Sequence, residues 1–181
     1  MRLSQGVEWG LHCALLLAQA PDGLAVPRRT LAEHYDLPEA YLAKQLQSLV
    51  AAGILHAVSG PRGGYRLARP PAEITVLDVL DAVEGTADPF VCQEIRQRGV
   101  IPVTPEQCRR PCAIAAVMTR AHQAWRASLR AVTLAELAGR VPRPVREQQR
   151  ARFAQLRQSP RRAGGPRSGT AAAGAAGSAH D

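Results

Sequence analysis

The 181-residue sequence predicts a mainly α-helical fold with one small β-hairpin, and three observations support this fold class. Apolar residues recur at three- and four-residue spacings over most of residues 4–84 and again over 111–132. A glycine-rich turn at 59–64 separates two short strand-like runs. From residue 142 onward Ala, Gly, Arg, Ser and Pro dominate, and such a composition buries too little apolar surface to offset the entropy of ordering.

Start and stop signals divide the folded part into elements. Pro21-Asp22-Gly23 ends the first helix, Gly53 ends the third, and Thr75 with Asp78 resembles a capping box at the start of the fourth. Residues 86–108 are irregular, with a short helix near 93–98. The predicted elements are helices over 4–20, 27–34, 38–52, 75–84, 111–132 and 133–139, and strands over 54–58 and 65–68.

This order of elements is that of a winged helix-turn-helix, whose second motif helix lies in the major groove of DNA. In the third predicted helix an apolar face that includes Leu42 and Leu46 lies opposite a polar face. Polar side chains of this kind suit phosphates and base edges, and a cation at the hairpin tip suits the minor groove. The alternative is a solvated helix face. The predicted DNA-binding residues are Arg28, Tyr41, Lys44, Gln45, Ser48 and Arg62.

The formal net charge of +8 is unevenly distributed. Residues 142–181 hold eight arginines and two acids, a net of +6, whereas 1–141 hold 15 basic and 13 acidic groups, a net of +2. The DNA footprint of the folded part is therefore local, and the tail either attracts phosphates without sequence preference or is a solvated extension. No run of about 18 apolar residues and no catalytic motif appears. We expect a cytoplasmic, nucleoid-associated protein that is not an enzyme.

Three of the four cysteines, Cys92, Cys108 and Cys112, fall within 21 residues, which indicates a metal or redox site. They precede or begin the long helix, and a helix N-terminus favours thiolates. Glu8 and His12 lie four residues apart on one face of the first helix and can complete a metal site. The alternative is a locally paired Glu8 and a core histidine. The fourth cysteine, Cys13, is predicted to be a small buried hydrophobe.

Four segments together resemble the winged helix of the IscR/NsrR/RsrR family of bacterial iron–sulfur regulators. They are Tyr41-Leu42-Ala43-Lys44, Ala52-Gly53-Ile54-Leu55, Arg62-Gly63-Gly64-Tyr65-Arg66-Leu67 and Ile74-Thr75-Val76-Leu77-Asp78-Val79. The resemblance covers about residues 1–140. It implies a homodimer built on the long helix, an operator in double-stranded DNA, and a cluster held between that helix and the preceding loop. The cysteine spacing, C-x15-C-x3-C, is wider than the commoner pattern of the family.

The stretches GVEWGLHC and FVCQEIRQRG are most similar to the redox-sensing RsrR branch. This resemblance implies a repressor that senses redox state through a [2Fe-2S] cluster with mixed ligands. The implied ligands are Cys92 and Cys112 of one subunit with Glu8 and His12 of the other, and Cys108 is a reserve ligand. Trp9, beside Glu8, is the expected redox switch, whose large ring occupies two positions depending on cluster charge. The alternative is a core or interface aromatic.

The same residues are compatible with other functions. A [4Fe-4S] cluster on the three cysteines and Glu8 predicts a nitric-oxide-responsive or cluster-assembly regulator. A reversible disulfide between Cys108 and Cys112, structural zinc, and an iron–sulfur electron carrier without a DNA role are further alternatives. The predicted organisation is a DNA-binding domain over 1–85, a cluster loop over 86–110, dimerisation and final helices over 111–141, and a disordered tail over 142–181.

Overall fold

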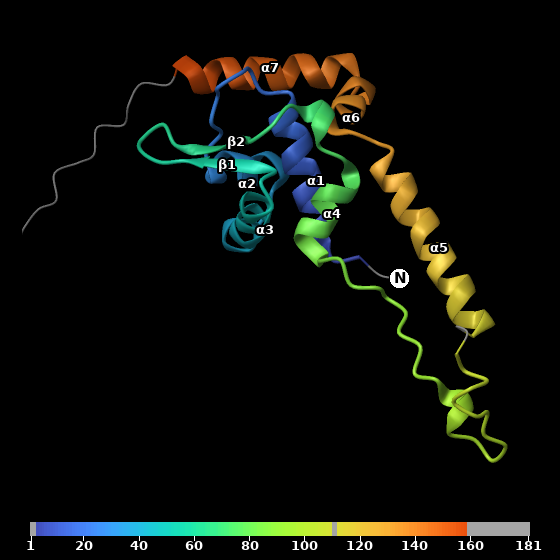
Figure 1. Cartoon of the computed structure of the whole chain (residues 1–181). Coiled ribbons are helices and arrows are strands. Elements are labelled where there is room, and N and C mark those ends of the chain that lie inside the picture. Colours follow the sequence, from blue (N-terminus) through green and yellow to red (C-terminus); the bar gives the residue numbers. More distant parts are fainter. Residues whose placement is uncertain (1–2, 110–111, 159–181) are drawn as a thin grey trace, which may run out of the picture.

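A computed structural model describes residues 3–109 and 112–158. The chain folds as a winged helix from which a long arm projects (Figure 1). Its elements are α1 (Gln5–Ala18), α2 (Arg28–Tyr35), α3 (Glu39–Ala51), β1 (Leu55–Val58), β2 (Gly64–Leu67), η1 (Pro71–Glu73), α4 (Val76–Glu84), η2 (Ile95–Gln97), α5 (Ala113–Arg130), α6 (Leu134–Arg140) and α7 (Arg143–Gln158). The predicted helices and hairpin through residue 140 are present, with ends shifted by a few residues.

The helix-turn-helix is built on the predicted apolar face of α3. Leu42, Leu46 and Leu49 are fully buried, and together with Leu31 of α2 they belong to the main core. Burying each leucine contributes about 1.5–3 kcal/mol. The turn between α2 and α3 contains Asp36 in the left-handed region, with φ 51°. The core therefore fixes which face of α3 points outward.

The wing is an antiparallel pair of strands in which Leu55 faces Leu67 and Val58 faces Gly64. It is attached to the segment before α2 by two 2.9 Å backbone hydrogen bonds between Val26 and Tyr65. Gly64 has φ 156°, and a Cβ there would lie 2.3 Å from the Val26 carbonyl oxygen. Only glycine lets the wing approach the body this closely.

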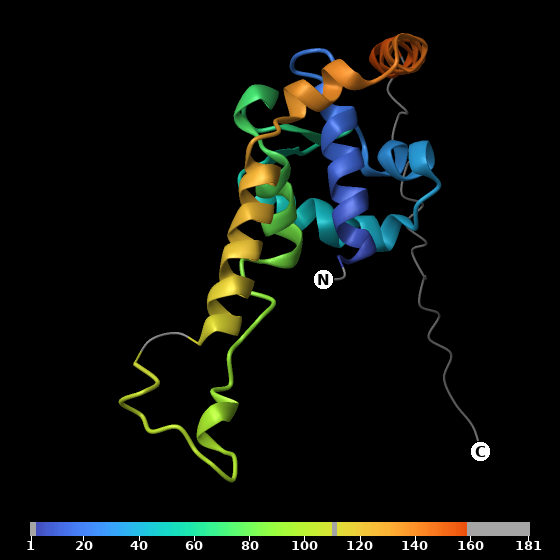
Figure 2. The ribbon, with the colours of Figure 1, turned by 90° about the vertical axis from the view of Figure 1, so that its right-hand side faces the viewer.

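Two helices of the body, α4 and α6, begin side by side. Thr75 caps α4 and Thr133 caps α6, each through a complete capping box. Backbone hydrogen bonds join Val76 N–H to the Val132 carbonyl at 2.9 Å and Leu134 N–H to the Ile74 carbonyl at 2.8 Å. Between these two points the chain passes through α4, and the arm consists of the irregular segment 85–109 together with Cys112 and α5 (Figures 1 and 2).

Most of α5 is exposed, and no residue in it is fully buried. Near its C-terminal end Trp125 and Leu129 pack against a small apolar cluster of Val7, Leu77 and Leu80. Farther along the arm the apolar side chains are uncovered. These exposed side chains are Val91, Ile95, Val100, Ile101, Ile114, Val117 and Met118.

The tail departs from the prediction of disorder, which is wrong for residues 143–158, because these form α7. Phe153 is only 2% exposed and joins the main core, and Leu156 packs beside it. These two residues and Gln149 fall on one helical face, so a narrow apolar stripe lies within an otherwise polar composition. The rest of the predicted tail, 159–181, lies outside the described residues. No helix in the described ranges is long and apolar enough to cross a membrane.

Candidate metal centre and DNA-binding surface

Two of the predicted ligands, Cys92 and Cys112, come together although twenty residues separate them. The Sγ atom of Cys92, after α4, lies 3.8 Å from the Sγ atom of Cys112, at the start of α5. The thiol of Cys92 also donates to Oε1 of Glu94 at 3.5 Å. Ligand atoms of Cys92, Glu94 and Cys112 all lie within 4.8 Å of one another, so these three side chains can hold one metal ion.

Cys112 is the N-cap of α5 and is the more acidic of the two thiols. Its Sγ accepts a hydrogen bond from the Ala115 N–H at 3.3 Å. This bond is the main reason that the pKa of Cys112 lies below its usual value. The helix dipole acts in the same direction. The arrangement therefore favours a thiolate at this position.

The pKa of the Cys92 thiol is shifted in the opposite direction. The Glu94 backbone N–H lowers the pKa of Cys92, but burial and the hydrogen bonds with Cys112 and Glu94 raise it by more, so the pKa lies above its usual value. Because the two thiols interact, they titrate together, and the first proton is lost from the pair and not from one thiol independently of the other. A bound cation would favour loss of both protons.

Glu94 is the site residue that the sequence reasoning missed. Its backbone adopts the left-handed region, with φ 46°, which is uncommon for a residue other than glycine. The guanidinium of Arg96 donates to its Oε2 at 2.6 and 3.1 Å and holds the pKa of the Glu94 carboxyl below its usual value. The Cys-x-Glu spacing is too common to have identified this carboxylate in advance.

Cys108 lies near the carboxylate of Glu94. A hydrogen bond from its thiol is one of the causes that lower the pKa of Glu94. Cys108 is half-buried and is not among the three residues whose ligand atoms converge. All four cysteines are free thiols in the structure. Cys13 is fully buried, as predicted, and burial raises its pKa to about 12. It therefore takes no part in this chemistry.

Glu8 and His12 lie on a different part of the molecule. Both are exposed on α1 and line a shallow hollow that also includes Leu3 and Leu11. The segment with the cysteines lies along the arm, away from α1 (Figure 2). Among the described residues, the candidate metal group contains neither Glu8 nor His12. A single chain thus brings the two cysteines together but not the complete predicted ligand set.

The predicted DNA-binding residues fall into two groups. Tyr41, which is 69% exposed, Lys44 and Arg62 all face solvent on α3 and the wing turn. Gln45 instead packs against Gly6 of α1, where an added Cβ would lie 2.7 Å from the Gln45 side chain. Gln45 is therefore half-buried where α1 packs against this flank of α3, whereas Tyr41 and Lys44 are exposed.

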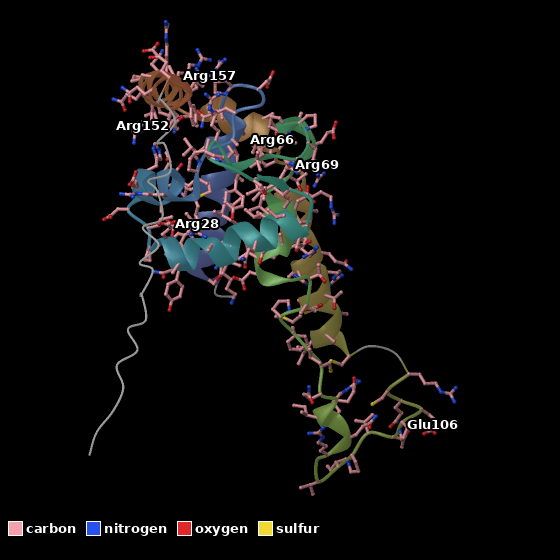
Figure 3. The ribbon with its side chains drawn as sticks, turned by 90° about the vertical axis from the view of Figure 1, so that its left-hand side faces the viewer. Arg28, Arg66, Arg69, Glu106, Arg152 and Arg157 are labelled. Atoms are coloured by element: carbon pink, nitrogen blue, oxygen red, sulfur yellow. The ribbon has the colours of Figure 1, made fainter. Side chains whose placement is uncertain are left out.

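The other two predicted contacts, Ser48 and Arg28, are less free than Tyr41. Ser48 is half-buried on α3. Arg28 donates from Nε to Oε1 of Glu39 at 2.8 Å and links the start of α2 to the start of α3. Arg28 remains on the side of the molecule that Figure 3 shows. A phosphate would have to compete with Glu39 for this guanidinium.

Comparisons with known proteins identify relatives of the whole winged helix and arm. The family described as "Rrf2: Iron-dependent Transcriptional regulator" matches residues 3–140. The HTH-type transcriptional regulator YffB of Lactococcus lactis subsp. lactis is 30% identical over 76% of this chain and 87% of its own length. BadM of Rhodopseudomonas palustris is 41% identical over 48% of this chain, and that match spans 54% of BadM.

Two solved structures are similar. The structure of CymR, the global cysteine regulator of B. subtilis, superposes with a TM-score of 0.64 at 25% identity and covers 78% of this chain and 99% of that chain. The structure of T. potens IscR superposes with a TM-score of 0.60 at 24% identity, and the match covers 80% of this chain and 90% of that chain. These likenesses confirm the predicted winged-helix fold.

Proposed function

This chain belongs to the Rrf2 family of transcriptional regulators, and on that premise we propose that it is a homodimeric repressor that senses redox state through an iron–sulfur cluster. Family membership confirms the predictions of transcription regulation, of DNA binding through a winged helix, and of a protein that is not an enzyme. The cluster, the dimer and the redox response are the proposal.

The observation that carries the proposal is the 3.8 Å separation of the Cys92 and Cys112 sulfurs. Two thiolates bound at about 2.3 Å to one tetrahedral metal ion lie about 3.8 Å apart, so the pair has the spacing of two ligands on one metal. Thiolates are also the usual ligands of iron–sulfur clusters. The residues present therefore fit the group that the family description implies.

The proposed ligands are Cys92 and Cys112 of one subunit with Glu8 and His12 of the second copy. The exposed positions of Glu8 and His12 on α1 support a role toward another chain. The uncovered apolar side chains of the arm, such as Ile114 and Val117, support a dimer in which the arm packs on a partner. Cys108 and Glu94 are the reserve ligands. When bound, a [2Fe-2S] cluster supplies a one-electron redox couple.

The residues of this chain connect the cysteine site to the DNA-binding unit. Cys112 begins α5, and the other end of α5 packs through Trp125 on Val7 of α1 and Leu80 of α4. Helices α1 and α4 both contact α3. A shift of α5 would thus change the packing behind the DNA-reading helix. We retain Trp9, half-buried against the main core, as the proposed switch residue on α1.

The test is anaerobic purification followed by absorption and paramagnetic spectra and by iron and sulfide counts per subunit. We expect two irons and two sulfides, lost in Cys92→Ser and Cys112→Ser, with changed spectra in Glu8→Gln and His12→Ala. Cys108→Ser should keep the cluster, and Cys13→Ala is the matched control because that thiol is buried elsewhere. A colourless protein without iron and sulfide overturns the proposal.

Structural zinc is a second candidate, because the same 3.8 Å spacing and the nearby Glu94 suit that ion equally well. Metal analysis separates the two. One zinc per chain that depends on Cys92, Glu94 and Cys112 but not on Glu8 or His12 would indicate zinc. Four irons per subunit would instead indicate the [4Fe-4S] alternative.

A further inference from the structure

Helix α7 carries an unusual amount of unpaired positive charge. It contains five arginines and one acid, Glu147, and only Arg143 pairs with that acid, at 2.8 Å. The other four arginine side chains of α7 have no hydrogen bond or ion pair with any residue in the described ranges. By contrast, the arginines that form ion pairs in the rest of the described chain are Arg28, Arg29, Arg69, Arg96 and Arg126.

The body of the protein fixes the direction of these arginines. Phe153 anchors α7 in the main core at 2% exposure. Arg150 and Arg157, two turns apart on one flank, line an open hollow with Pro21, Ala154 and Gln158, and no acidic residue lines it. Arg152 lies on the other flank, facing α2, where its charge adds to burial in lowering the pKa of His34. The guanidinium groups therefore border both sides of the anchored stripe.

The wing and α7 share one side of the molecule. Figure 3 views the side toward which the wing extends, and Arg152 and Arg157 of α7 appear there with Arg28 and Arg66. The family match ends at residue 140, three residues before α7 begins. α7 thus lies beyond the part of the chain that the family description matches, packs on the main core through Phe153, and carries exposed arginines.

We propose that α7 is an accessory DNA-binding element, in which Arg150, Arg152 and Arg157 contact phosphates of the duplex that flanks the site bound by α3 and the wing. Guanidinium groups match phosphate oxygens in geometry and charge. Contacts of this kind add affinity and salt dependence without reading sequence. The proposal rests on the DNA-binding role of the family and is independent of the cluster.

The experiment compares two duplexes with the full-length protein. A binding sequence is first selected from a random library by the wild type. It is then presented either trimmed to its protected core or with about 15 bp, roughly one and a half helical turns, on each side. Affinity is measured by anisotropy over a salt series. The variant is Arg150→Gln/Arg152→Gln/Arg157→Gln, and the matched control is Arg98→Gln/Arg130→Gln/Arg140→Gln, which removes the same charge from exposed sites outside α7.

We expect the wild type and the control to bind the flanked duplex more tightly, and the α7 variant to lose this preference while it binds the core normally. The log–log salt slope on the flanked duplex should fall by about 0.9 for each lost contact. Equal slopes for variant and control overturn the proposal. So does a variant that loses binding to phosphatidylserine vesicles but not to the flanked duplex, because α7 would then bind a lipid surface. Failure of the wild type to bind any core duplex would instead count against the regulator function itself.

Discussion

Arg126 of α5 donates two hydrogen bonds to Asp81 of α4, from Nη1 to Oδ1 at 2.7 Å and from Nη2 to Oδ2 at 2.6 Å. The two side chains are 19% and 22% exposed, and the paired bonds fix the angle between the helices. This pair lies between the arm, which carries the cysteines, and the helix that packs behind α3. It is therefore the clearest polar connection between the candidate metal centre and the DNA-binding unit.

A double-mutant cycle on Asp81→Ala and Arg126→Ala should show a larger coupling free energy than the same cycle on Glu33→Ala and Arg29→Ala. The control pair also has a short contact, 2.7 Å, but its arginine is 79% exposed and its charges are well solvated. Unfolding in urea measures both cycles. Couplings of equal size would contradict a structural role for the Arg126–Asp81 pair.

Cys112 should be the most readily alkylated of Cys13, Cys92 and Cys112 in metal-free protein near neutral pH. Its pKa is lowered, so the reactive thiolate is present at lower pH than for an ordinary cysteine. The pKa of Cys92 is raised and that of Cys13 is about 12, so Cys92 should react more slowly and Cys13 only after unfolding. Peptide mass spectrometry after timed iodoacetamide treatment measures this order. Preferential labelling of native Cys13 would show that the core packing is wrong.

Leu42 and Tyr41 are neighbours on α3 with opposite roles. Leu42→Ala should lower the free energy of unfolding by about 2–5 kcal/mol, because the side chain is fully buried. Tyr41→Ala should change stability by no more than about 0.5 kcal/mol but weaken DNA binding about fivefold, the equivalent of one hydrogen bond. Urea unfolding and anisotropy measure the two effects. A Tyr41 variant with unchanged affinity would remove this residue from the DNA surface.

Phe153→Ala should destabilise the protein by about 3 kcal/mol and expose α7 to proteases, because the ring is buried in the main core. Gln148→Ala, on the exposed side of the same helix, is the matched control and should have little effect. Denaturation and limited proteolysis provide the measurements. Equal stability of the two variants would mean that α7 is not docked.

Trp9→Ala should reduce the difference in operator affinity between the oxidised and reduced protein, if the ring relays the state of the site to α3. Trp125→Ala serves as a comparison, because Trp125 packs where α5 meets α1 and α4. Anisotropy under controlled potential measures the difference for each variant. An unchanged redox dependence in the Trp9 variant, together with a reduced one in the Trp125 variant, would move the relay from α1 to α5.

The candidate site was only partly predictable from sequence. The clustering of Cys92, Cys108 and Cys112 along the chain was enough to predict a metal or redox site, and the structure brings the ligand atoms of Cys92 and Cys112 together. Glu94 was missed, because its contribution depends on a left-handed backbone and on Arg96, and neither has a sequence signal. A helical wheel places Gln45 beside the polar face of α3, but it does not show that α1 packs against that flank.

The sequence by itself determined the order of the elements through residue 140, the buried face of α3 and the glycine-dependent wing, because hydrophobic periodicity and turn chemistry are local properties. Only the tertiary structure decided that Cys92 meets Cys112, that Arg126 binds Asp81, and that the apolar stripe around Phe153 docks as α7. These are contacts between residues distant along the chain. They depend on how whole surfaces pack together, which hydrophobic periodicity and turn residues along the sequence do not determine.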